Sequence, residues 1–167
     1  NYRKAVETYI SLPDNLKENS KIKLLISRIY YQLENFADAK KLLNSIQNDS
    51  ATESIKNYLL ANIYFREKKY TDAIKYYESY FKNNPADIDS LSNIILSYRE
   101  VKDMQKYNFY FKFLLEKYNP DSIPVKMILD NIKWLLDNKK YEFLDDCLAI
   151  CDNMLNKNID YIKLKLK

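Results

Sequence analysis

The sequence predicts an all-α protein built from tandem antiparallel helix hairpins, and three observations support this prediction. The 167 residues contain no Gly, four Pro and 16 Tyr. Apolar residues recur at intervals of three and four, which is the spacing of one helix face. The whole pattern then returns with a period of 34 residues, and such periods are typical of helical repeat proteins.

The absence of Gly argues against several fold classes together. Compact β and α/β proteins use Gly at turns that need a positive φ, and phosphate-binding loops use it where the backbone approaches the ligand closely. Sandwiches, barrels, Rossmann units and P-loops are therefore disfavoured. Short helices joined by tight polar corners fit the composition better.

The repeat is visible when units are aligned from Ser20, Ser54 and Ile88. Three extra residues before Val125 restore the register for a further unit. Equivalent positions then hold residues of the same kind. The seventh position holds Ile26, Leu60 and Ile94, the eleventh Tyr30, Tyr64 and Tyr98, the seventeenth Phe36, Tyr70 and Met104, the twentieth Ala39, Ala73 and Tyr107, and the twenty-fourth Leu43, Tyr77 and Phe111.

We expect a single domain over residues 1–167, in which each complete unit is a pair of helices. Polar corners should join the two helices of a pair at Glu34-Asn35, Lys68-Lys69, Lys102-Asp103 and Lys139-Lys140. The expected units are the second helix alone at 1–19, complete units at 20–53, 54–87, 88–121 and 125–158, and the start of another helix at 159–167.

The second unit carries a specific family pattern. The residues Leu60-Ala61, Tyr64, Tyr70, Ala73, Tyr77 and Pro85 resemble the tetratricopeptide repeat, with a bulky and a small residue in the first helix, aromatic residues at fixed offsets, an Ala in the second helix and a closing Pro. The resemblance extends over nearly the whole chain and weakens after residue 88. It implies a right-handed α-solenoid in which stacking of neighbouring units provides the stability.

The resemblance also implies that the first helices line a concave groove for a partner. The second, fifth, sixth, ninth, twelfth and thirteenth positions of each unit should face it, beginning with Lys21 and Leu24. Arg and Tyr are enriched at binding hot spots, and Asn can bond a peptide backbone with both donor and acceptor groups. The expected groove residues are Arg28, Tyr31, Gln32, Tyr58, Asn62, Phe65, Arg66, Asn93, Leu96 and Arg99.

One subclass of the family grips a C-terminal carboxylate with Lys, Asn, Asn, Lys and Arg. In this chain Asn62, Asn93 and Lys126 match that pattern, but Tyr58 and Asp130 stand where two of the cations should be. We therefore do not expect this chain to bind chaperone tails.

The sequence contains no combination of residues that points to catalysis. It has no His, and His is the commonest general base and metal ligand. Cys147 and Cys151 share a helix face, but two thiolates are too few for a zinc site and a disulfide between them would distort the helix. We expect both to be small core residues, and we expect neither enzymatic activity nor a cofactor or metal.

The leading hypothesis is a non-catalytic protein–protein interaction scaffold that binds a peptide segment or protein in the groove, within a larger assembly. Stacking or self-association could instead use exposed ends or the Tyr-rich second helices. Two alternatives stay open: an RNA-binding helical repeat, and a regulatory repeat region of an enzyme whose catalytic domain lies outside this chain. The tyrosines of the second helices are Tyr76, Tyr77, Tyr80, Tyr107 and Tyr110.

Nucleic acid is not the expected partner. The net charge of +4 is spread among interleaved acidic residues, whereas nucleic-acid domains concentrate Lys and Arg on one face. A base-reading repeat needs recurring polar residues at equivalent positions, but the ninth position holds Arg28, Asn62 and Leu96.

The sequence also bears on the location of the protein. No apolar run approaches the roughly 20 residues of a membrane span, and the chain begins without Met or a signal-like segment, so we expect a fragment of a longer protein. A cytoplasmic location is favoured, with a periplasmic or envelope location as the alternative if the missing N-terminus carries a signal. Abundant Asn, Lys, Ile and Tyr, taken with the family resemblance, suggest a bacterial envelope, secretion or motility assembly.

Overall fold

The computed structural model describes residues 2–47, 50–119 and 122–155, and within them it contains ten α-helices and no strand. The predicted all-α class is confirmed. The chain forms two compact units, Asn1–Val101 and Lys102–Lys167, which are described separately below. No helix in the described ranges is both long and apolar enough to cross a membrane.

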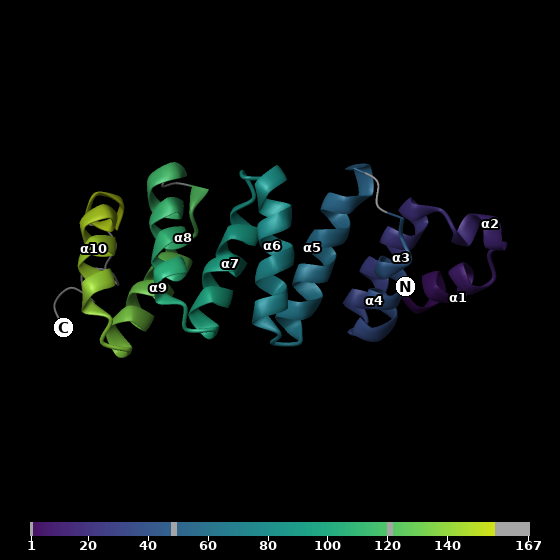
Figure 1. Ribbon diagram of the computed structural model, residues 1–167, viewed down its shortest axis with the longest axis horizontal. Coiled ribbons are helices and arrows are strands. Elements are labelled where there is room, and N and C mark those ends of the chain that lie inside the picture. Colours follow the sequence, from purple (N-terminus) through teal and green to yellow (C-terminus); the bar gives the residue numbers. More distant parts are fainter. Residues whose placement is uncertain (1, 48–49, 120–121, 156–167) are drawn as a thin grey trace. The chain divides into compact units, whose positions relative to one another are not determined.

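The first compact unit consists of successive helices that pack as antiparallel neighbours. The helix α3 packs against α4, α5 against α6, and α6 against α7 (Figure 1). This order of contacts is consistent with a helical solenoid. The helices are α1 (Tyr2–Ile10), α2 (Asp14–Lys17), α3 (Ser20–Gln32), α4 (Phe36–Asn44), α5 (Ser50–Arg66), α6 (Tyr70–Asn83) and α7 (Ile88–Glu100).

The second compact unit contains α8 (Met104–Lys117), α9 (Val125–Asp137) and α10 (Tyr141–Leu155). The helices α9 and α10 form a hairpin, and α10 also contacts α8. Pro124 precedes α9 with φ of −58°, a value that its ring already fixes. Residues 156–167, which include the predicted start of a further helix, lie outside the described part.

The helix boundaries follow the predicted period at most positions. The second helices begin at Phe36, Tyr70, Met104 and Tyr141, which is the seventeenth position of each predicted unit. Two boundaries differ. The helix α5 begins at Ser50, one turn before the predicted unit start at Ser54, and residues 2–17 hold two helices, α1 and α2, where one was expected.

Each polar corner within a hairpin contains one residue in the left-handed region of backbone space. The φ values are 57° for Glu34, 59° for Lys68, 61° for Lys102 and 54° for Lys139. Helices often end in this way, usually with Gly at the left-handed position. Because the chain has no Gly, charged residues adopt the conformation instead.

Backbone hydrogen bonds explain why these corners keep that conformation. At the first corner the N–H of Asn35 donates to the carbonyl oxygen of Tyr30 at 2.9 Å, and the N–H of Glu34 donates to Tyr31 at 3.0 Å. This pair of bonds satisfies carbonyl groups that a helix end would otherwise leave without partners. The same pair of bonds occurs after Lys68 and after Lys139.

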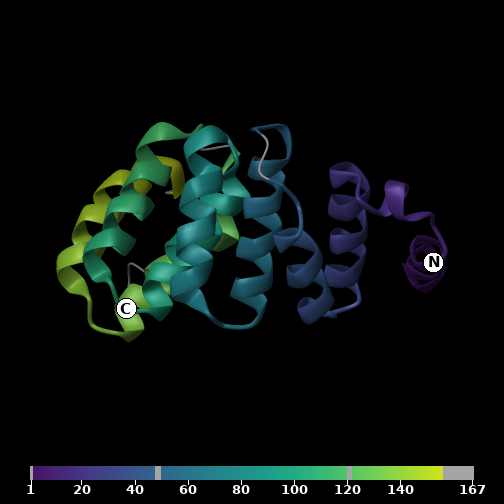
Figure 2. The same ribbon diagram turned by 45° about the vertical axis from the view of Figure 1, so that its right-hand side comes forward.

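The core of the first compact unit includes the residues that define the repeat. Ile26, Leu60 and Ile94, at the seventh position, are all buried, and Ala39 and Ala73, at the twentieth, are completely covered. Small side chains at these points let helices approach closely. One cluster spans α3, α4 and α5, which lie together in both views (Figures 1 and 2). Its buried members are Leu24, Ala39, Leu43, Ile46, Leu59, Leu60 and Ile63.

The second compact unit has its own core. Tyr107 is fully buried, and its hydroxyl donates to Asn131 Oδ1 at 3.2 Å, while Asn131 Nδ2 donates to the Met127 carbonyl at 2.8 Å. The Tyr107 ring lies 5.5 Å from the half-buried ring of Trp134. Cys147 is buried and makes no disulfide, which confirms its prediction as a core residue. The side chain of Cys151 lies outside the described part.

Candidate functional site

The predicted groove residues all belong to the first compact unit, on the first helices α3, α5 and α7. These residues fall into three sets. Of the ten residues in the expected groove list, Arg28 lines a pocket, two are fixed by a buried tyrosine, and most of the others are held by aromatic packing or ion pairs. The expected groove-facing residues Lys21 and Leu24 line the same pocket.

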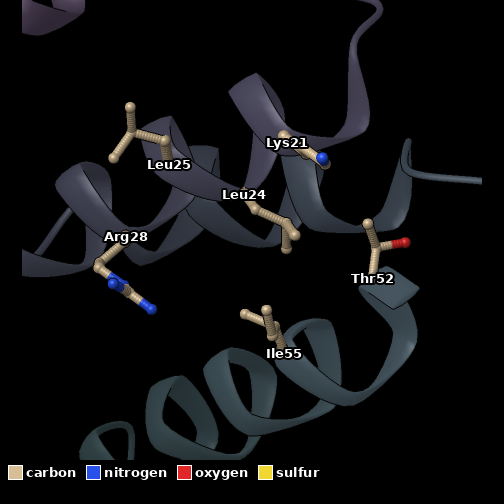
Figure 3. A pocket seen from close by; sticks show the side chains of 6 residues that line it. All are labelled: Lys21, Leu24, Leu25, Arg28, Thr52 and Ile55. Carbon is tan, nitrogen blue, oxygen red and sulfur yellow. The ribbon is translucent and has the colours of Figure 1, made fainter. Parts of the chain in front are cut away.

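The pocket lies between α3 and the start of α5 and has a volume of about 300 Å³. This size is at the lower end of the range for ligand pockets. Its walls are mainly apolar, and Figure 3 shows Leu24 of α3 and Ile55 of α5 pointing toward the space between the two helices, while Leu25 points away from α5. The lining residues are Lys21, Leu24, Leu25, Arg28, Thr52 and Ile55.

Two cations stand at the pocket, and neither has an internal counter-ion. Both Lys21 and Arg28 are exposed, and among residues 2–47, 50–119 and 122–155 no carboxylate lies within ion-pair distance of either. Other cations of the same compact unit do have such partners. Lys40 Nζ lies 2.7 Å from Glu67 Oε1, for example, and Arg66 Nη2 lies 2.6 Å from Glu34 Oε1.

A buried tyrosine connects two predicted groove residues. Tyr77, on α6, is completely covered. Its hydroxyl donates to Asn62 Oδ1, on α5, at 2.7 Å and accepts from Asn93 Nδ2, on α7, at 2.9 Å. Burial raises the pKa of Tyr77 well above its ordinary value, so the hydroxyl keeps the proton that it donates. The tyrosine therefore sets the orientation of both amide groups.

This arrangement leaves hydrogen-bonding groups of both amides available. Each Asn side chain has one acceptor oxygen and two N–H donors. Asn62 uses only its oxygen on Tyr77, which leaves its two donors. Asn93 uses one donor, which leaves its oxygen and a second donor. Both residues are half-buried, so the remaining groups lie at a surface that a partner can reach.

Aromatic packing holds three further predicted residues. The ring of Tyr31 lies 6.0 Å from Phe36, and the ring of Tyr58 lies 4.8 Å from Tyr80. Phe65 makes edge contacts with two rings of α6, Tyr70 at 5.7 Å and Tyr77 at 6.3 Å. These side chains are half-buried. They help to fix the surface, and part of each stays exposed.

The other predicted residues differ in how firmly they are held. Arg66 is paired with Glu34, the left-handed residue of the preceding corner. The side chain of Arg99 is only 18% exposed, and its Nε lies 3.8 Å from Glu100 Oε1. Leu96 is half-buried, and Gln32 is exposed.

Three pocket residues were not predicted. Leu25 and Ile55 stand at the sixth and second positions of their units, which are groove-facing positions by the same resemblance, so the pattern could have found them. Thr52 could not be found in this way because α5 begins at Ser50, before the predicted unit.

The Tyr-rich second helices do not form one exposed face. Tyr77 and Tyr107 are completely buried, so they cannot contact a partner. Tyr76 and Tyr80 are half-buried; Tyr76 stacks on Tyr64 with ring centres 5.5 Å apart. Burial, together with a hydrogen bond to Asp87, raises the pKa of Tyr80 to about 12. These tyrosines mainly join helices to one another.

The candidate carboxylate clamp has a further defect beyond its missing cations. Lys126 Nζ lies 2.7 Å from Asp130 Oδ2, one turn along α9. The one Lys that matched the clamp pattern therefore has an acidic partner within its own helix.

Comparison with known proteins finds no family model and no curated protein that matches the chain. The fold and the surface described above define an all-helical protein with sequential helix-pair contacts, consistent with a helical repeat.

Proposed function

We propose that this chain is a tetratricopeptide-like protein-interaction scaffold that binds an extended segment of another protein along α3, α5 and α7. The observation that supports this function best is the bridge Asn62–Tyr77–Asn93. A buried hydroxyl fixes two amide side chains on neighbouring first helices and leaves donors and an acceptor at a half-buried surface.

The 34-residue period of the corners supports the proposal that the chain is a tetratricopeptide-like repeat protein. Left-handed corner residues occur at 34, 68 and 102, and again at 139 after the three extra residues. The small and bulky residues that define the tetratricopeptide pattern are buried where that pattern requires packing, as at Ala61 and Ala73.

An extended peptide is the ligand that suits fixed amides. Its backbone presents an N–H and a C=O at every residue, and one Asn can bond both groups. Amides held in place by Tyr77 lose little side-chain freedom when the ligand binds, which favours affinity. Half-buried rings such as Tyr58 and Phe65 add contact area of the kind found at hot spots.

The test is selection of ligands from a random-peptide display library on the immobilised protein, followed by affinity measurement for the enriched peptides. Asn62→Asp keeps an oxygen that accepts from Tyr77 but removes the two outward donors. We expect it to weaken binding about tenfold, which corresponds to about 1.4 kcal/mol. Asn44→Asp is the matched control, because Asn44 is exposed at the end of α4 and carries the same charge change.

Enriched peptides that bind both variants equally would contradict the assignment to this surface. A library that yields no binding peptide would contradict peptide recognition itself. Retention of RNA in place of peptide, falling steeply with salt, would favour the nucleic-acid alternative.

A further inference from the structure

We infer that the pocket between α3 and α5 takes a bulky apolar side chain bracketed by carboxylates, so that the partner segment is acidic. This inference rests on the proposed function and adds the chemistry of the ligand to it.

The apolar half of the inference follows from the pocket walls. Leu24 is buried at the base, whereas Leu25 is 57% exposed and Ile55 is 40% exposed. Two large aliphatic side chains thus line a space of about 300 Å³ and stay partly exposed to solvent. An apolar side chain of a partner would remove both from water, and such burial is the main source of affinity in small pockets.

The acidic half follows from the charges. Lys21 and Arg28 stand at opposite ends of the pocket in Figure 3, with Leu24 and Leu25 between them. Six other cations of the first compact unit have a carboxylate within ion-pair distance, whereas Lys21 and Arg28 are among those that have none. A ligand with carboxylates at both ends would supply the missing counter-ions. The six paired cations are Lys17, Lys23, Lys40, Arg66, Lys69 and Arg99.

The spacing of the two cations limits the pattern of the ligand. Lys21 and Arg28 are seven residues apart on α3, so they share a face and are separated by two turns, or roughly 10 Å. An extended peptide advances about 3.3 Å per residue. Acidic residues about three apart, with the apolar residue between them, therefore match both cations. A nucleic acid would match the charges but would leave Leu25 and Ile55 without an apolar partner.

Synthetic peptides of one length provide the direct probe. In one series a central Leu is flanked on each side by Glu, with the two Glu two, three or four residues apart. In matched series Gln or Lys replaces Glu. Fluorescence polarisation should show at least tenfold tighter binding for the best Glu peptide than for its Gln counterpart, and no binding for the Lys series. Equal affinity for Glu and Gln peptides would overturn the inference.

Charge reversal tests the location. The double variant Lys21→Glu, Arg28→Glu should lose its affinity for the Glu peptides and should bind the Lys peptides instead. The control is Lys75→Glu, Lys82→Glu, which makes the same charge change at exposed positions of α6 and should keep the preference for Glu. A control that behaves like the pocket variant would show that only net charge matters, and would overturn the assignment to the pocket.

Methyl NMR gives a second readout that needs no charge variant. Addition of the best Glu peptide to the unchanged protein should shift the methyl signals of Leu24, Leu25 and Ile55 more than those of Leu43 in the core. Shifts confined to other residues would place the peptide elsewhere. An oligouridine RNA of equal charge that produced the same shifts would overturn the requirement for an apolar side chain.

The two proposals can fail separately. If peptides from the random library bind, lose affinity on Asn62→Asp, and yet show no acidic preference and tolerate the double pocket variant, the proposed function stands and this inference falls. If neither the library nor the Glu series yields binding, both fall.

Discussion

Glu34 and Lys68 occupy equivalent corners one period apart, and both have a left-handed backbone with φ of 57° and 59°. In this region the Cβ atom crowds the neighbouring carbonyl oxygen, and only Gly avoids the cost. The corner hydrogen bonds after each residue keep the conformation in place. The helix hairpins of this chain therefore contain strain at a regular spacing.

Relief of this strain gives the first prediction. Lys68→Gly should raise the free energy of unfolding by about 1 kcal/mol, because Gly adopts a positive φ without the steric cost. Lys68 is exposed, so little else should change. Urea denaturation measures the effect. The control is Lys68→Ala, which retains Cβ and should bring no gain; an equal gain in both variants would exclude backbone strain as the cause.

Removal of the hydroxyl of Tyr77 should destabilise the first compact unit. In Tyr77→Phe, Asn62 Oδ1 and Asn93 Nδ2 both lose their partner, and half-buried polar groups without partners cost about 1–3 kcal/mol in total. Thermal or urea unfolding measures the loss. Tyr76→Phe, at the neighbouring half-buried ring, should change stability by less than about 0.5 kcal/mol. A Tyr77→Phe variant as stable as Tyr76→Phe would show that the bridge contributes nothing.

The ion pair of Glu67 should make stability depend on pH. Burial alone would raise the pKa of the Glu67 carboxyl, but hydrogen bonds and charges from Lys40 and Lys69 outweigh it, so this pKa lies below its ordinary value of 4.5. A carboxyl whose pKa is lower in the folded state stabilises the fold above the unfolded pKa. That contribution is lost as the pH falls through the folded pKa.

Glu67→Gln should therefore cost about 1–2 kcal/mol at pH 7 and less at pH 3, because the wild-type carboxyl gains a proton as the pH falls through its folded pKa. Urea denaturation at the two pH values measures both differences. Glu34→Gln is a useful comparison, because its pair with Arg66 is more exposed and should be worth less than about 1 kcal/mol. A cost of Glu67→Gln that is the same at both pH values would contradict the linkage.

The pair of Lys23 and Glu18 should respond differently to loss of each partner. Lys23 is only 4% exposed, while the Glu18 side chain is 76% exposed. Glu18→Gln leaves a buried ammonium group whose remaining partner is the Ser45 carbonyl at 3.4 Å, and we expect a loss of about 1–3 kcal/mol.

Lys23→Met removes that buried charge and leaves Glu18 in water, so its cost should be below about 1 kcal/mol. Urea denaturation measures the free energy of unfolding of both variants, and each variant serves as the control for the other. A larger cost for Lys23→Met than for Glu18→Gln would show that the ammonium group contributes more than its burial costs.

The repeat could be predicted from the sequence because it depends on local properties. Apolar spacing and a fixed period place the starts of the second helices at Phe36, Tyr70 and Met104, and the buried positions follow from the same columns. The start of α5 differs because the last residues of one connection can extend the next helix by a turn. A pattern with a fixed period does not predict a helix that begins one turn early.

The side-chain contacts of the candidate site could be predicted only in part from the sequence. The pattern placed Asn62 and Asn93 toward a groove, but it treated Tyr77 as packing only and did not indicate that its hydroxyl joins them. Nothing in a glycine-free sequence indicates that Lys68 has a positive φ. Whether Arg28 lacks a counter-ion while Arg66 has one depends on which side chains meet between units, and that is known only from the folded chain.

Two polar contacts between successive hairpins join residues nearly one period apart. Arg66 bonds Glu34 and Lys40 bonds Glu67, at separations of 32 and 27 residues. Closing loops of this length costs little more chain entropy than closing shorter ones. Each hairpin can therefore form its contacts with the preceding one as soon as it leaves the ribosome, before the rest of the chain has been made.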